Sequence, residues 1–558
     1  MKTSVRAWIF CVWGLLYVFS GRGECADARI AQTLAGIEAV PISADAATAF
    51  RHVQGASQLI QEYGDQKRFD DAFRIYEALS GLCRRYEKDE KISYEQSRML
   101  ARLASTLAAD RRFDDAVRLF LELSVLCDAF PENTDMVAQE AWCAVGLSYA
   151  WTLLGQSDKN FPGEARKVQT VVLGRMTPQD DPNLPVLRQQ ITAVRNLLLY
   201  FGALDLEKEA LASYEAIRRA SSGRLADREI ALSNLKASDN MIYFYLGKKD
   251  PRGAEAIFSD VLSDAPLLGS DSGIGELQAL NASHLLWTYA GAEDLGSMDI
   301  GGAYRAYGFT VGLRAAFDEA IFASRELEAF HNLILANCSA GRIAKAQKLY
   351  DQFLSLYADI DDQRICRYQA KIASRLLGLY AKGHPSEKVL DQAEEIFEAF
   401  HALRVAHVDD AEIALREMSA AKEMVLLHSG AGNPEEALNY YYRAAERAGC
   451  FAENAEMAAE QARAANFLLE ACAGTSRRVD EFELSRGARI YKDVTVLRAR
   501  FADDADLGHL QAKAAYWLYR LCRKADGATA RQEMQRLTQD LDGLYRRFPS
   551  DFFDRLIQ

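Results

Sequence analysis

Apolar side chains recur along this chain at the three- and four-residue spacing of an amphipathic helix. In segment 69–79, Phe69, Ala72, Tyr76 and Leu79 fall on one stripe, and two aspartates occupy the first turn, where negative charge suits the helix dipole. The same arrangement returns 44 residues later, at 113–123. A period of this length is typical of a repeat array in which each unit stacks on its neighbours.

An alanine followed four residues later by tyrosine or phenylalanine marks the repeated helix. The small side chain admits a neighbouring helix, and the ring fills the gap beside it. Seven pairs of this kind, spaced by about one or two repeats, define the array: Ala72 with Tyr76, Ala116 with Phe120, Ala210 with Tyr214, Ala254 with Phe258, Ala346 with Tyr350, Ala393 with Phe397 and Ala437 with Tyr441. The alanines are 44, 94, 44, 92, 47 and 44 residues apart, so each long step contains one further, degenerate unit. We expect about 10 or 11 units.

The composition favours an all-α fold. Proline is scarce, with 11 residues in 558, and no long alternating runs of β-branched residues occur. Hydrophobic residues make up 49% of the chain, which argues against disorder. The net charge is −13 and no basic stripe is present, so we expect no nucleic-acid partner.

The first 28 residues resemble an export signal. Lys2 and Arg6 precede an apolar run at 8–19, and the small residues at 26–28 predict cleavage after Ala28. The run is too short to span a bilayer, which takes about 20 residues. We therefore expect an exported protein, either periplasmic or secreted.

A lipid anchor on Cys25 is the less favoured alternative, because 22–24 match poorly the apolar and small residues that precede such sites. Membrane association is expected only through such a lipid or through a partner. The eight cysteines after residue 28 are widely spaced and form no Cys-x-x-Cys pair, which favours free, buried thiols.

The pattern divides the chain into six segments. After the signal at 1–28 we expect helical repeats at 29–177 and, beyond a proline-marked break, middle repeats at 178–265. A glycine-rich irregular segment at 266–312 is either a degenerate repeat with loose turns or a functional loop. Further repeats follow at 313–445, and degenerate repeats with capping helices at 446–558.

The units resemble tetratricopeptide repeats lengthened from 34 to about 44 residues. Tyr245, Ala254, Phe258 and Pro266 match the spacing of that family. Gly341 and Gly432, five residues before marker alanines, match its turn glycine, whereas its first-helix tryptophan is missing. The resemblance covers roughly 49–445. It implies a right-handed α-solenoid, a superhelix of antiparallel helix pairs with a concave inner face, and a binding or scaffolding role.

Asparagines recur on the expected first helices, 14 residues before a marker alanine, at Asn196, Asn240 and Asn332. In the family this position faces the groove, and peptide-binding members use an amide there. The resemblance therefore implies that these asparagines bind a partner, together with their neighbours Arg195, Tyr243 and His331. The alternative is that the amides bridge neighbouring helices, since an amide both donates and accepts hydrogen bonds.

No catalytic motif or metal-ligand cluster stands out, and we expect no catalytic residue, cofactor or metal. The favoured function is a non-catalytic, exported scaffold that binds a peptide or helix of a partner protein, for example in a cell-envelope assembly or transport complex. Two alternatives stay open. One is a periplasmic small-ligand carrier or transporter accessory subunit with a ligand pore in the superhelix. The other is a divergent helical-ring enzyme that processes murein.

Overall fold

The computed structural model describes residues 23–41, 44–154, 161–176, 183–268, 270–292, 295, 298–357, 360, 362–383, 385–474 and 478–548. These residues form 23 α-helices and no strand, which confirms the predicted all-α fold. Most of the predicted signal segment lies outside the described residues. The chain divides into two compact units, and each is described by itself: unit 1 runs to residue 281, and unit 2 comprises 282–558 together with 249–251.

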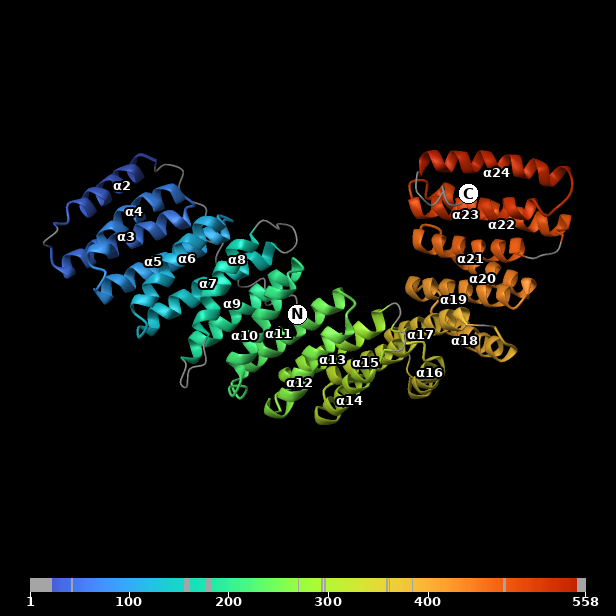
Figure 1. The fold of residues 1–558 in the computed structure, drawn as a ribbon, viewed down its shortest axis with the longest axis horizontal. Coiled ribbons are helices and arrows are strands. Elements are labelled where there is room, and N and C mark those ends of the chain that lie inside the picture. Colours follow the sequence, from blue (N-terminus) through green and yellow to red (C-terminus); the bar gives the residue numbers. More distant parts are fainter. Residues whose placement is uncertain are drawn as a thin grey trace. The chain divides into compact units, whose positions relative to one another are not determined.

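The helices of unit 1 follow one another side by side in sequence order (Figure 1). They are α2 (Gly23–Glu38), α3 (Ala46–Asp65), α4 (Phe69–Arg85), α5 (Glu90–Ala109), α6 (Phe113–Ala129), α7 (Thr134–Leu154), α8 (Pro162–Arg175), α9 (Leu184–Ala203), α10 (Glu207–Ser221), α11 (Arg228–Gly247) and α12 (Pro251–Asp264), with a short 3-10 turn η2 (Ala265–Leu267). Helix α13 (Ser272–Gly291) crosses the division between the units.

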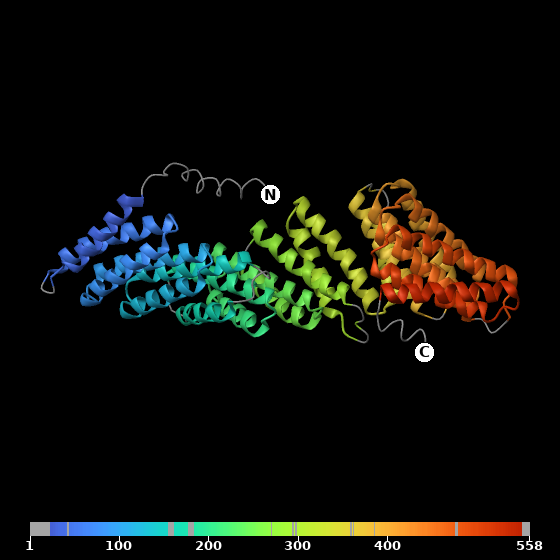
Figure 2. The ribbon, with the colours of Figure 1, turned by 90° about the horizontal axis from the view of Figure 1, so that it is seen from above.

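Unit 2 continues the same alternation, and its helices run from yellow to red in Figure 2. They are α14 (Gly301–Ala316), α15 (Ala320–Ser339), α16 (Ile343–Tyr357), α17 (Gln363–Lys382), α18 (Glu387–Ala406), α19 (Ala411–Gly430), α20 (Pro434–Cys450), α21 (Ala455–Gly474), α22 (Glu481–Arg500), α23 (Ala505–Cys522) and α24 (Ala528–Arg547). The 22 helices from α3 to α24 thus form 11 consecutive pairs, each with a first and a second helix, as the repeat spacing predicted.

The seven marker alanines all lie on second helices, and each is 0% exposed. The structure completes the series with one small, buried residue on each remaining second helix: Ala165, Ala303, Gly487 and Ala530. Ala165 and Ala303 are the degenerate units expected within the two long steps. At Gly487 the approach is so close that a Cβ atom would lie 2.8 Å from Leu521 Cδ2.

Several marker tyrosines also link one repeat to the next. The hydroxyl of Tyr76 donates a hydrogen bond to Glu122, and that of Tyr214 donates to Asp260 Oδ2 at 2.8 Å. In unit 2, Tyr441 donates to Asp493 Oδ2 at 3.1 Å. Each acceptor carboxylate lies two residues after the ring position of the following repeat, so these bonds recur in register along the chain.

The marker phenylalanines make no such link, because their rings carry no hydroxyl group. Phe120 and Phe397 are buried, at 0% and 1% exposure, and therefore contribute to the packing and not to a surface that a partner could reach. The ring of Phe397 meets that of Tyr440 edge-on, with centroids 5.0 Å apart, and the guanidinium of Arg443 lies 4.6 Å from its centroid. The marker rings, which the sequence pattern treats as equivalent, thus differ in what they bond.

First helices begin where an aspartate or asparagine caps them. The side-chain oxygen accepts a hydrogen bond from a backbone N–H in the first turn, which satisfies a donor that the helix itself cannot pair. Ten first helices have this cap, provided by Asp45, Asp89, Asn133, Asn183, Asp227, Asp271, Asp362, Asp410, Asn454 and Asp504. The cap explains why the helices start at equivalent places.

The glycine-rich segment at 266–312, expected to be irregular, is mostly helical. It contains α13 and the first part of α14, which carries Ala303 and Tyr307 at the marker spacing. Glycines 291, 308 and 312 have no neighbouring atoms near the Cβ position, so each costs only about 1 kcal/mol of helix stability. Buried side chains such as Leu285 and Tyr289 provide the compensating packing. The segment is a degenerate repeat.

The expected subdomain break at 178–185 also differs from the structure. Residues 177–182 lie outside the description, but α8 and α9 pack against each other and α7 packs against α9, so unit 1 continues through this region. The division between the two units falls instead near residue 281. None of the described helices is both long and apolar enough to cross a membrane.

Six of the described first helices end in a turn with one residue in the left-handed conformation. This residue lies five positions before the marker alanine and is glycine in two repeats, Gly341 and Gly432. Four other repeats place a residue with a side chain there: Lys67, Arg111, Asp205 and Lys249, with φ of 60°, 66°, 60° and 54°. A Cβ atom is disfavoured in this conformation, so these four turns are locally strained.

The substitution Arg111→Gly should raise the free energy of unfolding by about 0.5–1 kcal/mol, because glycine removes the Cβ clash. As a matched control, Gly341→Ala should lower it by about 1 kcal/mol, since Gly341 has φ of 65° and no neighbouring atom near its Cβ position. Urea unfolding of both variants checks the signs. A destabilised Arg111→Gly variant would contradict the assignment of strain.

Candidate functional site

Two of the asparagines proposed for partner binding lie inside the helical packing. Asn196 and Asn332 are only 7% and 5% exposed. Asn196 Nδ2 donates to Ser148 Oγ at 3.3 Å, joining α9 to α7. Asn466, another asparagine on a first helix, donates to the backbone oxygen of Leu510 at 3.0 Å, joining α21 to α23. At Asn196 and Asn466 the amide therefore bridges neighbouring first helices, and Asn196 and Asn332 are too buried to line a groove.

His331 is likewise buried, at 2% exposure, whereas the resemblance implied a position in the groove. Its Nδ1–H donates to Asn332 Oδ1 at 3.1 Å, and its ring stacks on Tyr368 with centroids 4.3 Å apart. Burial is the main cause that lowers the pKa of His331 to about 3, and the charges of Lys371 and Arg416 add to it. The ring is neutral in the folded protein at neutral pH.

Arg195 and Tyr243 are placed differently, on the solvent side of the first helices of unit 1. We call the exposed side chains of α3, α5, α7, α9 and α11 the first-helix face. Tyr243 is 59% exposed, Arg195 is half-buried, and Asn240 is half-buried one turn before Tyr243. These three of the six proposed residues therefore have access to a partner.

Large apolar side chains gather on the first-helix face. Trp142, Tyr149, Leu199 and Tyr243, here called the apolar row, are 45%, 55%, 36% and 59% exposed. Trp142 and Tyr149 are seven residues apart on α7, which puts them on the same stripe of the helix. Exposed rings that cluster in this way are typical of protein-binding surfaces.

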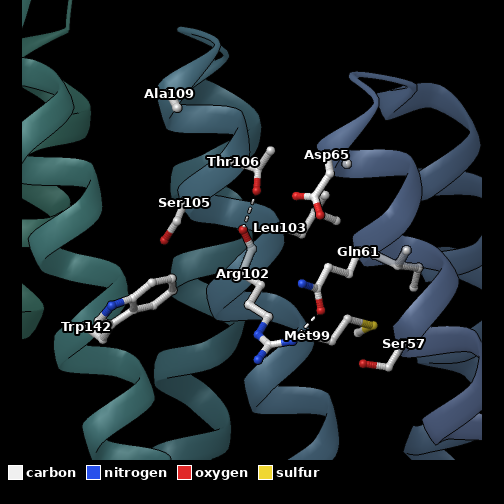
Figure 3. A pocket seen from close by; sticks show the side chains of 12 residues that line it. Ser57, Gln61, Asp65, Met99, Arg102, Leu103, Ser105, Thr106, Ala109 and Trp142 are labelled. Atoms are coloured by element: carbon white, nitrogen blue, oxygen red, sulfur yellow. Dashed lines mark hydrogen bonds between the residues drawn. The ribbon is translucent and has the colours of Figure 1, made fainter. Parts of the chain in front are cut away.

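Two open hollows flank Trp142. One, of about 450 Å³, lies between α3, α5 and α7 and is lined by Gln61, Asp65, Arg102 and Thr106. Figure 3 shows Arg102 between Trp142 on one side and Gln61 on the other, with the guanidinium donating a hydrogen bond to the Gln61 oxygen. Partial burial raises the pKa of Asp65.

The second hollow, of about 390 Å³, continues along the same face. It is lined by Trp142 and Val145 of α7, Arg188 and Thr192 of α9, and Glu229 of α11. Leu199 lies seven residues after Thr192, and Tyr243 fourteen after Glu229, so each shares a stripe with a residue that lines the hollow. The hollows and the apolar row therefore form one surface across five first helices.

Two cations on this surface lack an acidic partner. Among the described residues, no carboxylate lies within ion-pair distance of Arg195 or Lys236, whereas Arg188 pairs with Asp227 and with Glu229. Burial lowers the pKa of Arg195. Burial, followed by the charge of Arg195, lowers the pKa of Lys236. An anionic group placed here would relieve both effects.

The sequence reasoning missed Trp142, Tyr149, Leu199 and Lys236 as surface residues of this face. Their signal was present: Leu199 and Tyr243 each lie 11 residues before a marker alanine, on the same side of consecutive first helices. The sequence prediction was based on recurring asparagines, and it did not consider large apolar side chains at equivalent positions of the first helices.

The described residues offer little that suits catalysis. No group of three or more His, Cys, Asp or Glu side chains among them could hold a metal ion. The structure describes eight cysteines, and six of them are buried. Burial raises the pKa of Cys83, Cys143, Cys338 and Cys522 to about 12, so these thiols are not activated nucleophiles.

The buried His331 makes the folded protein less stable in acid. The pKa of His331 is about 3 in the folded state and 6.5 when unperturbed, so below pH 6.5 the unfolded state binds the extra proton and stability falls toward pH 3. When the pH is lowered from 7 to 5, the free energy of unfolding of the parent chain should fall by about 2 kcal/mol more than that of the His331→Gln variant, which has no imidazole to protonate. Urea unfolding at both pH values measures this, and equal losses would contradict it.

No protein-family model and no curated protein matches the sequence. Several solved structures are similar to it, and three of them are described here. One, from work on a phosphorylation switch that controls the interaction between cadherin and β-catenin, is 11% identical with a TM-score of 0.33, covering 82% of this chain and 97% of that chain. A chain of the structure of Naa15/Naa10 bound to HypK-THB is 11% identical with a TM-score of 0.26, covering 95% of each chain.

The third, the TPR domain of P58(IPK), is 14% identical with a TM-score of 0.17, covering 80% of this chain and 98% of that chain. These TM-scores are low, so the assignment of the fold rests on the chain itself. Its 11 helix pairs confirm the number of units that the sequence pattern predicted, and each second helix carries a small, buried residue. The chain is an all-α array of paired helical repeats.

Proposed function

We propose that the protein is an exported, non-catalytic scaffold whose first-helix face in unit 1 binds a segment of a partner protein. The segment carries apolar side chains and at least one carboxylate, in extended or helical form. The observation that carries this proposal is the apolar row, Trp142, Tyr149, Leu199 and Tyr243, beside the unpaired cations Arg195 and Lys236.

The apolar row supplies the attractive surface. Burying large, exposed rings releases water, and aromatic side chains dominate the energetics of protein interfaces. Trp142 lies between two open hollows, which offer room for side chains of the bound segment on either side. Because both hollows are open and lie on one face, they suit a chain that passes along the helices.

Arg195 and Lys236 determine the charge of the segment. The whole chain has a net charge of −13, so unpaired cations on this face stand out from an acidic background. A carboxylate of the partner would form charge-assisted hydrogen bonds with Arg195 or Lys236 and would relieve their mutual repulsion. An acidic, apolar segment is therefore complementary to this face.

The first-helix face can be tested with a photo-crosslinking residue at Tyr243 in the full chain, produced in its native host. A second chain carries the same residue at Val125, which is 67% exposed on the second helix α6. We expect the Tyr243 position to crosslink one defined protein segment that contains apolar and acidic residues, and the Val125 position to leave that segment unlabelled. Equal labelling from both positions would contradict the proposal.

A synthetic peptide of the crosslinked segment then measures the contribution of each group. Tyr243→Ala and Trp142→Ala should each weaken binding about tenfold or more, as truncation of a central aromatic residue does. Lys236→Met should weaken it chiefly at low salt. Val125→Ala is the matched control. Because these side chains are exposed, the thermal unfolding of all variants should stay close to that of the parent, so unchanged affinity cannot be attributed to misfolding.

Export is supported by the charged and apolar pattern of the first 28 residues. Helix α2 spans the proposed cleavage site, and its buried residues Ile30 and Ile37 would stay in the mature chain. We expect the mature protein to begin at Arg29, in the periplasm or the medium. Intact-mass measurement of protein from fractionated cells tests this, and an unprocessed chain in the cytoplasm would overturn the proposed export.

A further inference from the structure

We propose that unit 2 holds a separate binding site for a phosphoryl group, formed by Lys371 and Arg375 of α17 and Arg416 of α19. The site uses no residue of the first-helix face of unit 1 and does not depend on the function proposed for that face.

The three cations converge because of helix geometry. Lys371 and Arg375 are four residues apart on α17, which puts them one above the other on one side of the helix. Helices α17 and α19 pack side by side, and Arg367 of α17 lies 3.5 Å from Glu412 of α19. Lys371 and Arg416 each follow one turn after this contact, so they face each other across the two helices. In agreement, burial and then the charge of Arg416 lower the pKa of Lys371, and the charge of Arg375 adds to this.

The surrounding cations on the first helices are paired, whereas these three are not. Arg367 lies 3.0 Å from Asp410, and Lys422 lies 3.1 Å from Glu423 and 3.0 Å from Glu460. Among the residues that the structure describes, no carboxylate lies within ion-pair distance of Lys371, Arg375 or Arg416. Arg375 is exposed and Lys371 and Arg416 are half-buried, so an anion from solution can reach the cluster.

One buried hydrogen-bond donor of the cluster, Nε–H of Arg416, has no partner in the described part of the chain. Nε2 of His331 also has none, but because Nδ1 carries the proton of this neutral ring, Nε2 is an acceptor and does not bind the phosphate. Buried polar atoms in native proteins are nearly always bonded, and such exceptions point to a missing ligand.

The charge balance favours a phosphoryl group over a carboxylate. Three cations face one acidic group, Glu412, whose charge reaches Lys371. Glu412 already lies 3.5 Å from Arg367, so it compensates the cluster only in part. The remaining charge of about two units matches a phosphate monoester, which carries about −1.5 to −2 at neutral pH. Guanidinium groups also match the geometry of phosphate oxygens.

The test uses the full-length mature chain and measures binding by calorimetry at constant ionic strength. The soluble probes are inorganic phosphate and glycerol 3-phosphate, with acetate as the comparison for a single carboxylate. A second arm measures co-sedimentation with phosphatidylcholine vesicles that contain phosphatidic acid, against vesicles of phosphatidylcholine alone. This arm distinguishes a lipid headgroup from a free phosphate ester.

Two variants and one control test whether Lys371 and Arg416 form the binding site. Lys371→Met and Arg416→Gln should each weaken binding about tenfold or more, because each removes charge-assisted bonds to the phosphate. Arg463→Gln removes a cation of the next first helix, α21, that is already paired with Glu460, and should leave binding unchanged. Circular dichroism and the thermal midpoint show that each variant is folded, and two site variants guard against the failure of one.

Saturable binding of the soluble phosphates that both site variants weaken would support the site with a free phosphate ester as its source. Binding only to the phosphatidic acid vesicles, weakened in the same way, would support it with a lipid headgroup. No binding in either arm, binding that both site variants retain, or equally tight binding of acetate would overturn the assignment.

Discussion

Close contact at one small residue on each second helix is the constraint on which the fold depends. The marker alanines are fully buried, and Gly487 leaves no room even for a methyl group beside Leu521. Added side-chain volume in such a contact costs about 1–3 kcal/mol, because the helices must separate or the side chains must leave their preferred rotamers. The neighbouring helix approaches at the small residue and the ring one turn later fills the remaining gap. This pairing sets the spacing of the array within each unit.

The repeat was predictable because its signal is local. Seven alanine–aromatic pairs sufficed to indicate an all-helical array and its number of units, and the turn position before each marker follows from the same register. Three of the four missed units differ from the pattern at one position: Gln169 and Met534 replace the ring, and Gly487 replaces the alanine. The fourth unit, with Ala303 and Tyr307, matches the pattern but lies in the glycine-rich segment that was expected to be irregular. The glycine-rich segment was harder, because glycine counts favour loops. Several of its glycines are exposed and therefore lower the stability of their helix only slightly. Their exposure depends on packing that the sequence does not show.

The surface residues were less predictable, for a physical reason. Whether a first-helix side chain is exposed depends on how the neighbouring helices cross it, and this changes between repeats. Asn196 is closed off by Ser148 of the preceding first helix, whereas Tyr243, at a nearby position of a later repeat, stays open. The same packing leaves Arg195 and Lys236 in unit 1, and Lys371, Arg375 and Arg416 in unit 2, without acidic partners. Which cations lack an acidic partner depends on which helices are neighbours, and the sequence alone does not show this.

The hydrogen bonds from marker tyrosines to carboxylates bear on how such a chain can evolve. Tyr76, Tyr214 and Tyr441 each donate to an acid at the same position of the following repeat. A genetic duplication or deletion that spans one whole repeat joins a donor of one copy to an acceptor at the equivalent place in another. The new junction inherits a working bond together with the small residue and ring that pack around it. The length of this array can therefore change in whole steps without the invention of a new interface.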